Sequence, residues 1–491
     1  MVAAEAGPLA KTGGLADVMH ALPSALRAKG CDVRVALPCY GRIPAEHRGE
    51  PVAECHVRLG GETMAGVIRE SRLPGTDVPL YLIEHDGLFD RDDLYGSNGG
   101  MYPDSLERFA FFNLAILDGV PRIGWRPDIV HCHDWHAGLL PVLLRDGWGE
   151  HPFWRDALTL FTIHNLGYQG RFGVDKAGLL GLSADKLTDA GIVHEGSLNL
   201  MKGAIVYADR ISTVSETYAR EIATPGSGQG LDPFLRARRH DLSGIVNGVD
   251  YTLWNPETDP MIPARFGAAA LEGKARCRAA LRDRFDLPEA EGPIFAMVSR
   301  LVWDKGIDLV VHALPKLAEL HVQLAVLGSG DPAIQLALEQ AVARYPQQLA
   351  VHIGYDESLA HQLYAGADFF LMPSQTEPCG LSQLYALAYG APPVVRRTGG
   401  LADTVVDATP VNIARGVATG LAFRPPTVNA LVRAVERAVH LYRRSDLYAA
   451  VQFAGMQRDF SWQRQSEQYL RLYDAMLTAP VAASAGEEDL P

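Results

Sequence analysis

One stretch of this 491-residue sequence combines the residue types that a group-transfer reaction needs. Residues 369–372 form an apolar run typical of a buried strand, which ends at Pro373-Ser374. The carboxylate Glu377 follows, and Gly380 then opens a segment whose apolar residues have helical spacing. In an open α/β sheet, ligands bind beyond a strand's carboxyl end at a helix N-terminus, where free N–H groups favour an anion. The stretch therefore predicts an anion site beside a reactive carboxylate.

A hexapeptide occurs twice in the chain. Residues 12–17 and 398–403 both read Thr-Gly-Gly-Leu-Ala-Asp, and a cation precedes each copy, Lys11 in the first and Arg397 in the second. Either two βα turns resemble each other by accident, or both loops face one shared ligand. A lysine beside two glycines suits a phosphate, because the backbone can approach the anion closely. A loop lysine is more often a solvated surface charge, so both interpretations stay open.

The chain is too long for one ordinary core, so two domains are expected. Apolar strand-like runs alternate with helical segments in both halves, which predicts mostly parallel α/β sheets with sites at the strand carboxyl ends. A Gly/Pro/Asn/Asp-rich stretch from residue 243 onward marks the boundary. The expected divisions are an N-terminal domain at 1–243, a C-terminal domain at 244–457, a helix at 458–477 that packs back on the first domain, and a disordered tail at 478–491.

The elements can be placed from the same patterns. The expected strands are residues 32–38, 79–83, 128–132, 158–163 and 210–214 in the first half, and 294–298, 322–327, 350–353, 369–372, 393–395 and 421–423 in the second. The expected helices include 106–117, 139–144, 430–442 and 462–477.

Composition excludes several classes of function. A net charge of −13 leaves no basic stripe for a nucleic acid, although a few local cations suffice for a small anion. The six cysteines lack metal-ligand spacing, which argues against a zinc site or disulfide framework and favours a reducing, cytoplasmic compartment. No apolar run is long enough for a membrane span, and the first residues lack signal-peptide features. Only residues 1–4 could form a strand before the first glycine loop, so we expect a misassigned start or a few missing residues.

Five motifs together resemble the bacterial glycogen synthase and plant starch synthase family. They are Lys11-Thr-Gly-Gly-Leu-Ala-Asp, His131-Cys-His-Asp-Trp-His-Ala-Gly, Thr162-Ile-His-Asn-Leu, Val298-Ser-Arg-Leu with Asp304-Lys-Gly, and Glu377-Pro-Cys-Gly-Leu. The resemblance implies two facing Rossmann-like domains of the GT-B type, with the active site in the cleft between them. It also implies a retaining transfer of glucose from ADP-glucose to the non-reducing end of an α-1,4-glucan such as glycogen. ADP-glucose is then a substrate, no metal or other cofactor is expected, neither nucleic acid nor membrane is a partner, and the oligomeric state stays open.

The resemblance also implies roles for individual residues. Glu377 would be the active-site carboxylate near the donor sugar, His164 would donate to a sugar hydroxyl, and Asp134 would be a carboxylate on the donor or acceptor side. Arg300 and Lys305 would hold the leaving diphosphate. The other residues implied in substrate binding are Lys11, Thr12, Gly13, Gly14, Asp17, Asn247, Ser299, Tyr355, Cys379, Gly380, Leu381, Ser382, Gln383, Thr398 and Gly399. Retention can arise by double displacement or by attack on the leaving-group face, and the residues do not separate these routes.

Some positions leave the assignment incomplete. Tyr385 stands where many relatives of this fold carry a ribose-binding glutamate, so recognition of the ribose has no assigned residue. Ser382 replaces the more usual threonine and keeps the hydroxyl. Tyr355 would stack on the adenine ring by resemblance, although such a residue is also typical of a half-buried core position. The glycine-rich loop 94–103 is either a plain surface loop or a mobile segment on the acceptor side.

Three patterns point elsewhere and are weak. Gly328-Ser-Gly-Asp-Pro-Ala matches a dinucleotide fingerprint, but Pro332 falls at the expected helix start. Asp90-Arg-Asp has a metal-diphosphate pattern but follows no strand end. His131, His133 and His136 could suggest a metal, but the first two alternate along a strand and no third ligand is evident. The alternatives to a glucan synthase are another nucleotide-sugar enzyme such as an epimerase or a sucrose-type synthase, a catalytically silent glucan-binding protein, and a dehydrogenase.

Overall fold

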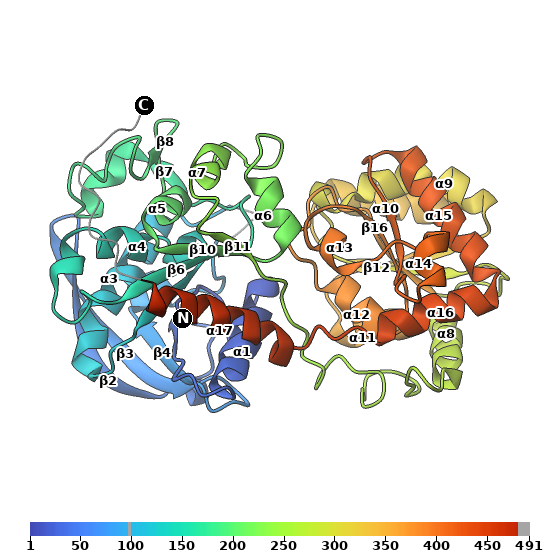
Figure 1. Cartoon of the computed structure of the whole chain (residues 1–491), viewed down its shortest axis with the longest axis horizontal. Helices are drawn as coiled ribbons and strands as arrows, with labels where there is room; N and C mark the ends of the chain where they lie inside the picture. Colours follow the sequence, from blue (N-terminus) through green and yellow to red (C-terminus); the bar gives the residue numbers. More distant parts are fainter. Residues whose placement is uncertain (97–99, 480–491) are drawn as a thin grey trace. The chain divides into compact units, whose positions relative to one another are not determined.

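The chain forms two compact α/β units in this computed structural model (Figure 1), which describes residues 1–96 and 100–479. Unit 1 comprises Met1–Thr213, Ile222–Ile245 and the described chain from Gln463 onward. Unit 2 comprises Val214–Glu221 and Val246–Trp462. Each unit has its own parallel sheet, so the expected pair of α/β domains is confirmed.

The parallel strands of unit 1 are joined by the first residues of the chain. They are β1 (Val35–Pro38), β4 (Pro79–Glu84), β5 (Ile129–His133), β6 (Leu158–Ile163), β10 (Arg210–Thr213) and β11 (Leu242–Gly244). They belong to two four-stranded sheets with the orders β1-β4-β3-β2 and β11-β10-β6-β5. Val2 forms parallel bridges with both Ala36 and Cys132, and so links β1 to β5. The glycine loop at residues 11–14 thus follows a strand end where the strand order reverses, which is the usual ligand position in such sheets.

An antiparallel hairpin at one edge of unit 1 was not expected. It consists of β2 (Glu50–Leu59) and β3 (Glu62–Arg72), and Gly60 and Gly61 form its turn with φ angles of 58° and 89°. A two-residue Gly-Gly turn between alternating polar and apolar residues is a recognisable hairpin signal. A second, three-stranded antiparallel sheet contains β7 (Arg171–Gly173), β8 (Val193–His194) and β9 (Ser197–Asn199).

The helices of unit 1 include one from the end of the chain. The helices before it are α1 (Gly14–Arg27), α2 (Asp86–Phe89), α3 (Ser105–Ile123), α4 (Leu139–Leu144), α5 (Leu200–Tyr207) and α7 (Asp232–Ala237), whereas α6 (Glu216–Ile222) belongs to unit 2 except for its last residue. The last helix, α17 (Trp462–Thr478), runs beside α1 (Figure 1, red). Glu467 of α17 accepts a bond from Lys29 at 3.1 Å, and the hydroxyl of Tyr473 lies 2.8 Å from His131 Nδ1.

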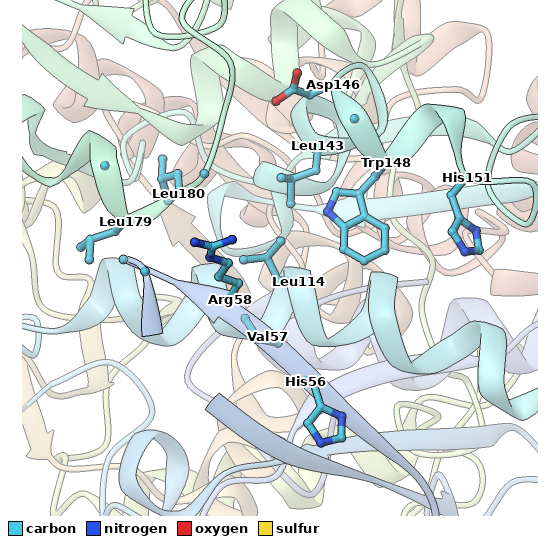
Figure 2. Close-up of a pocket in the computed structure, with 15 residues that line it drawn as sticks. His56, Val57, Arg58, Leu114, Leu143, Asp146, Trp148, His151, Leu179 and Leu180 are labelled. Carbon is cyan, nitrogen blue, oxygen red and sulfur yellow. The ribbon is translucent and has the colours of Figure 1, made fainter. Parts of the chain in front are cut away.

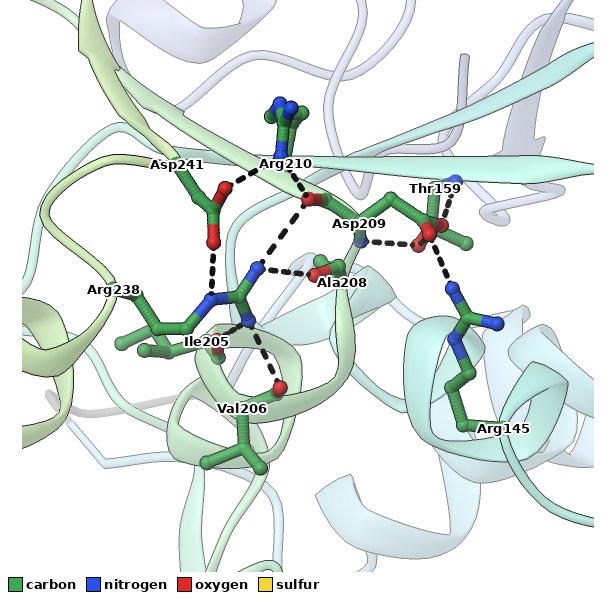
Figure 3. A network of polar contacts seen from close by, with 9 residues as sticks. All are labelled: Arg145, Thr159, Ile205, Val206, Ala208, Asp209, Arg210, Arg238 and Asp241. Atoms are coloured by element: carbon green, nitrogen blue, oxygen red, sulfur yellow. Dashed lines mark hydrogen bonds and ion pairs between the residues drawn. The ribbon is translucent and has the colours of Figure 1, made fainter. Parts of the chain in front are cut away.

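A polar network joins the amino-terminal ends of β6, β10 and β11 (Figure 3). It therefore lies at the edge of the sheet away from the strand carboxyl ends, where ligands are expected. Asp209 accepts from the N–H and hydroxyl of Thr159, both at 2.8 Å, and from Arg145. Arg238 donates to the carbonyls of Ile205 and Val206 at the end of α5, both at 2.9 Å, and to Asp241 at 2.7 Å. A guanidinium at a helix C-terminus satisfies carbonyls that have no partner within the helix.

Unit 2 contains one six-stranded parallel sheet in the order β14-β13-β12-β15-β16-β17. Its strands are β12 (Ile294–Val298), β13 (Gln323–Gly328), β14 (Leu349–Ile353), β15 (Phe369–Met372), β16 (Pro393–Arg396) and β17 (Leu421–Phe423). Its helices are α8 (Glu272–Arg284), α9 (Ile307–Glu319), α10 (Pro332–Arg344), α11 (Glu357–Gly366), α12 (Ser382–Ala388), α13 (Gly399–Thr404), α14 (Pro410–Ala414), α15 (Val428–Tyr442) and α16 (Ser445–Met456). The strand order reverses between β12 and β15, which places the ligand position at their carboxyl ends.

Helix α15 shows how a sequence pattern becomes packing in unit 2. Leu431, Val435 and Val439 recur every four residues, and each is at most 5% exposed. The helix begins where the Thr427 side chain accepts from the N–H of Ala430 at 3.3 Å, which satisfies one donor that the first turn leaves unpaired. The apolar face of α15 belongs to the buried cluster that also contains Phe369 of β15, so it holds the strand that leads into the glutamate loop.

Candidate functional site

The reactive carboxylate of unit 2 is buried and held by two side chains. Glu377 lies in the loop after β15 and is 7% exposed. Lys305 Nζ donates to its Oε1 at 2.9 Å and to its Oε2 at 2.8 Å, and Ser374 Oγ donates to Oε2 at 2.9 Å. A buried carboxylate needs such partners because burial removes its hydration. The side chain is therefore fixed in orientation before any ligand binds.

Lys305 reaches Glu377 because two neighbouring strands end side by side. β12 and β15 are paired in the sheet, and the short helix η5 (Trp303–Lys305) follows β12. The backbone N–H of Gln375 donates to the carbonyl of Asp304 at 2.7 Å, which ties the two loops together. Gly306 has a φ of 70°, and a Cβ there would lie 2.3 Å from the carbonyl oxygen of Pro373. Only glycine allows this approach.

The remaining cation and the ring implied in nucleotide binding lie on the surface of unit 2. Arg300 is exposed directly after β12, and Ser299 beside it is half-buried. Tyr355, after β14, is 77% exposed. The alternative that Tyr355 is a half-buried core residue is therefore wrong. Tyr385 is 9% exposed and stacks on Trp254 with ring centroids 3.9 Å apart. Tyr385 is therefore an apolar core residue of unit 2.

The glycine loop after Glu377 is held by its own side chains. Gly380 has a φ of 72°, and Gln383 Nε2 donates to the carbonyls of Cys379 at 3.0 Å and Gly380 at 2.9 Å. Leu381 and Ser382 are half-buried, so both can border a ligand. Burial raises the pKa of the Cys379 thiol to about 12 and keeps it protonated.

Asn247 lies against this loop. Its backbone N–H points at Cys379 Sγ at 3.4 Å. Its own side-chain oxygen Oδ1 is buried and has no hydrogen-bond partner among the described residues. A buried acceptor without a donor suits a ligand that brings one.

The second Thr-Gly-Gly loop packs on the backbone of the glutamate loop. Thr398 Oγ1 and the N–H of Gly399 donate to Glu221 Oε2 at 3.1 and 3.0 Å. Gly399 has a φ of 44°, and a Cβ there would lie 2.0 Å from the carbonyl oxygen of Glu377. The N–H of Gly400 donates to the same carbonyl at 3.1 Å. This copy of the hexapeptide supports Glu377 through its backbone.

The first Thr-Gly-Gly loop, in unit 1, is exposed and binds a glutamate in the same way. The N–H and hydroxyl of Thr12 donate to Glu5 at 2.7 and 2.6 Å, and the N–H of Gly13 donates at 3.1 Å. The hydroxyl of Tyr95 donates to the same carboxylate at 2.7 Å. Lys11 and Asp17 form an exposed ion pair at 2.6 Å, and Gly14 is also exposed. Sequence reasoning missed Glu5, because no spacing marks a single acid among alanines.

Asp134 follows β5 in a strained conformation. Its φ of 55° and ψ of 178° lie outside the left-handed helical region, in a conformation that is almost restricted to glycine. Its side chain accepts from the N–H of His164 at 2.8 Å, and its own N–H donates to the carbonyl of Thr162 at 3.0 Å. Burial raises the pKa of Asp134 to about 7. The strand ends of β5 and β6 thus bring Asp134 and His164 together.

His164 belongs to a row of neutral histidines. Burial lowers the pKa of His164 to about 3, and its Nε2 lies 2.9 Å from Nδ1 of His133. His131 binds the hydroxyl of Thr162 at 2.6 Å through Nε2. Within residues 1–96 and 100–479, no group of three or more His, Cys, Asp or Glu side chains could hold a metal ion. The sequence assigned no role to His133. Because His133 contacts Nε2 of His164, only Nδ1 of His164 can face a ligand.

The structure therefore forms two groups of candidate residues, one in each unit. In unit 1, Tyr95 connects the two parts of the group, because its hydroxyl binds Glu5 while its ring stacks on His136 at 4.7 Å.

The expected loop 94–103 includes residues 97–99, which lie outside the described residues, as does most of the expected tail. Pro332 is the first residue of α10, and Asp331 caps that helix by accepting from the N–H of Ala333. These residues of the dinucleotide-like pattern therefore have a structural role.

Two family models match the chain. The model described as "Starch synthase catalytic domain" covers residues 1–237, and the one described as "Glycosyl transferases group 1" covers residues 281–451. A glycogen synthase of Syntrophotalea carbinolica is 45% identical over 479 residues, covering 96% of this chain and 97% of that protein. Glycogen synthase 1 of Methylococcus capsulatus is 46% identical over 96% of this chain and 95% of its own length.

Two solved structures are similar. The catalytic domain of starch synthase IV from Arabidopsis thaliana, bound to ADP and acarbose, has a TM-score of 0.88 and 33% identity, and covers 97% of this chain and 98% of that one. A sucrose-phosphate synthase from Thermosynechococcus elongatus has a TM-score of 0.59 at 19% identity, with 98% of each chain covered, and shows the GT-B fold alone.

Proposed function

The chain belongs to the glycogen synthase and starch synthase family, and we propose that it transfers glucose from ADP-glucose to the non-reducing end of an α-1,4-glucan with retention of configuration. As a member of this family it is a glycosyltransferase that transfers glucosyl units in glycogen or starch synthesis. The choice of ADP as the nucleotide is supported by the starch synthase structure that holds ADP. The second product is then ADP.

The observation that carries the proposal is the buried Lys305–Glu377 pair at the carboxyl ends of β12 and β15. A glucosyl donor loses a diphosphate, so negative charge grows on the leaving group while positive charge grows at the sugar. In the proposal, Glu377 stabilises the oxocarbenium-like sugar, and the cations Arg300 and Lys305 neutralise the leaving diphosphate. Lys305 Nζ already donates a hydrogen bond to each carboxylate oxygen of Glu377. In the proposal it therefore holds the carboxylate in place while its positive charge also acts on the leaving diphosphate.

The nucleotide is proposed to bind unit 2. Tyr355, with most of its ring in solvent, supplies a face for adenine. The buried oxygen of Asn247 supplies an acceptor, and the other proposed contacts come from strand-end loops. These contacts are Ser299, Cys379, Gly380, Leu381, Ser382 and Gln383. Thr398 and Gly399 can bind the nucleotide only if Glu221 moves away, because its carboxylate accepts hydrogen bonds from the Thr398 hydroxyl and the Gly399 N–H.

Unit 1 is proposed to act on the same donor and on the acceptor. Lys11 carries the charge that the diphosphate needs, and its exposed pair is Asp17. The backbone of Thr12, Gly13 and Gly14 is exposed, but Glu5 accepts from the N–H groups of Thr12 and Gly13 and must release them before they bind the diphosphate. His164 is neutral, and with Nε2 against His133 it offers Nδ1 to a sugar hydroxyl. Asp134 holds the backbone N–H of His164 and so positions it. The proposal requires both groups of residues to reach one donor molecule.

Metal, partner and compartment are also part of the proposal. Protein cations carry the charge on the diphosphate, so no metal is assigned a step. No helix in the described residues is both long and apolar enough to cross a membrane. The six cysteines are free, which supports a reducing compartment such as the cytoplasm. Glycogen is the proposed acceptor.

The proposal is tested by transfer of radiolabelled glucose onto glycogen, with ADP-glucose and UDP-glucose as parallel donors. We expect transfer from ADP-glucose, and we expect Glu377→Gln to lose at least about 100-fold of it, because the sugar cation loses its fixed charge. Binding of ADP, measured by calorimetry, should persist in this variant. The exposed Glu319→Gln is the matched control and should transfer normally. Wild-type turnover in Glu377→Gln would refute the role, and a UDP preference would refute the donor.

A further inference from the structure

Unit 1 contains a pocket of about 710 Å³ whose residues have no part in the proposed transfer site. Its walls come from β2, the Gly60-Gly61 turn, α3, the end of α4 and the segment 178–181. The turn is fastened to that segment because the N–H of Gly60 donates to the carbonyl of Leu179 at 3.1 Å. The volume lies within the range of small-molecule sites, roughly 300–1,000 Å³.

The centre of the pocket is apolar. Leu114 of α3 and Leu143 of α4 are 6% and 3% exposed, and Val57 of β2 is 2% exposed. Figure 2 shows Arg58 on one side of these leucines and the indole of Trp148 on the other. Trp148 is half-buried and offers a flat face to an occupant. Gly178 and Gly181 face open space, since no atom of the described chain lies within 4 Å of a Cβ built on either.

Two polar side chains of the pocket, Arg58 and Trp148, are donors alone, and the others are His56, His151 and Asp146. Arg58 is exposed, and its guanidinium points into the pocket (Figure 2) and makes no side-chain hydrogen bond or ion pair with the described residues. The indole N–H of Trp148 can only donate. His151 Nδ1 accepts from the N–H of Phe153 at 3.2 Å, so a neutral ring carries its proton on Nε2.

The acidic residue of the pocket does not change this balance. The carboxylate of Asp146 accepts from the N–H and hydroxyl of Ser183 at 3.0 and 2.7 Å and forms no ion pair with Arg58 in the described chain. A neutral sugar needs both donors and acceptors for its hydroxyls, whereas an oxyanion needs donors alone. Arg58 and Trp148 therefore favour an acceptor-rich ligand at their side of the pocket.

We propose that this pocket binds a small organic oxyanion, a phosphate or carboxylate carried on a flat ring. The guanidinium of Arg58 takes the oxyanion through a planar fork of N–H groups, and the ring lies against Trp148 above the leucines. This site is separate in its residues from the proposed donor site, so its occupancy does not depend on the identity of the sugar nucleotide.

The test follows the indole ¹⁵N–H signal of Trp148 in the full chain, assigned by its disappearance in Trp148→Phe. The flat-ring probes are adenosine 5′-monophosphate for phosphate and nicotinate for carboxylate, glucose 1-phosphate and glucuronate carry the same groups on rings that are not flat, and maltotriose is the neutral probe. We expect at least one class of oxyanion to shift this signal and maltotriose to leave it unmoved. The class that shifts it identifies the ligand as phosphate or carboxylate.

Arg58→Gln should weaken that binding about 10- to 100-fold, because one charged contact is lost. Arg42→Gln is the matched control, since Arg42 is also exposed in unit 1 and does not line the pocket, and it should bind as the wild type does. Thermal unfolding checks that each variant is folded. The proposal is overturned if maltotriose binds as tightly as the oxyanions, if Arg58→Gln binds unchanged, or if no oxyanion moves the Trp148 signal at about 10 mM, a concentration above the Kd of even weak specific binding.

Discussion

The two Thr-Gly-Gly loops share six residues but differ in their surroundings. In unit 1, residues 11–14 are exposed, and no described atom lies within 4 Å of a Cβ built on Gly13. In unit 2, Thr398, Gly399 and Gly400 are buried, and Cβ atoms on the two glycines would lie 2.0 Å from the carbonyls of Glu377 and Cys379. The first loop presents its backbone to solvent, whereas the second supports the loop that carries Glu377.

One feature of chemistry is common to both loops, a carboxylate that accepts from the threonine hydroxyl and the next N–H. Glu5 does this in unit 1 and Glu221 in unit 2. Backbone N–H groups at the start of a helix attract an anion, and here a side chain of the protein supplies it. The motif thus encodes an anion-binding turn, and tertiary context decides whether a ligand can reach it.

Alanine at the two central glycines separates these roles and has the largest expected effect. Gly399→Ala combines a φ of 44° with a backbone clash, so we expect it to lower the free energy of unfolding by about 3 kcal/mol or more and to lose transfer activity. Gly13→Ala should leave stability unchanged or raise it by about 0.5 kcal/mol, because its backbone is extended and uncrowded. Urea unfolding measures both. Equal losses would contradict the assignment of support to one loop alone.

Much of this architecture is predictable from sequence because buried parallel strands are continuous apolar runs. Residues 158–163, 294–298 and 369–372 were each expected as strands, and β6, β12 and β15 have these bounds. The hairpin β2–β3 was missed because much of it faces solvent and its polar residues hide the strand pattern. Its Gly60-Gly61 turn was the available signal.

The candidate site was predictable where chemistry lies at a strand end. Glu377, Asp134 and His164 each follow a strand, so a local pattern places them. The partners that fix them are not local. Lys305 lies 72 residues from Glu377, and Glu221 lies 177 from Thr398, so only the folded sheet brings these pairs together.

Charge removal at the two cations that precede the loops gives the next largest effect. Lys11→Gln should lower kcat/KM for ADP-glucose about 10- to 100-fold, since a charged contact to the diphosphate is worth about 1.5–3 kcal/mol. Arg397→Gln should change it less than about twofold, because the second loop is proposed to act through its buried residues. Initial rates of ADP release measure both variants. A larger loss in Arg397→Gln would mean that the second loop also faces the diphosphate through its cation.

Asp134 in unit 1 differs from Glu377 in unit 2, because no cation within residues 1–96 and 100–479 forms an ion pair with its buried carboxylate, whereas Lys305 pairs with Glu377. Asp134 has a pKa of about 7 in the folded chain and about 4 when unfolded. Between these values the folded state keeps a proton that the unfolded state has released, so the free energy of unfolding falls as the pH rises through this window. Asp134→Asn, which keeps the size of the side chain but does not titrate, should remove about 1 kcal/mol per pH unit of that slope. Denaturant unfolding at pH 5 and pH 7 measures the difference, and identical slopes would contradict an uncompensated carboxylate.

The aspartates that end the two hexapeptides give the smallest difference. Asp403 accepts from the N–H and hydroxyl of Thr217 at 2.8 and 2.5 Å and so fixes the segment 214–221 that carries Glu221. Asp403→Asn should lower the free energy of unfolding by about 1–2 kcal/mol, because the amide accepts more weakly than the carboxylate. Asp17→Asn should change it by less than about 1 kcal/mol, because its pair with Lys11 is exposed. If the two variants unfold alike, the buried and exposed copies of the motif would contribute equally to stability, and the distinction between a supporting loop and a presenting loop would fail at this position.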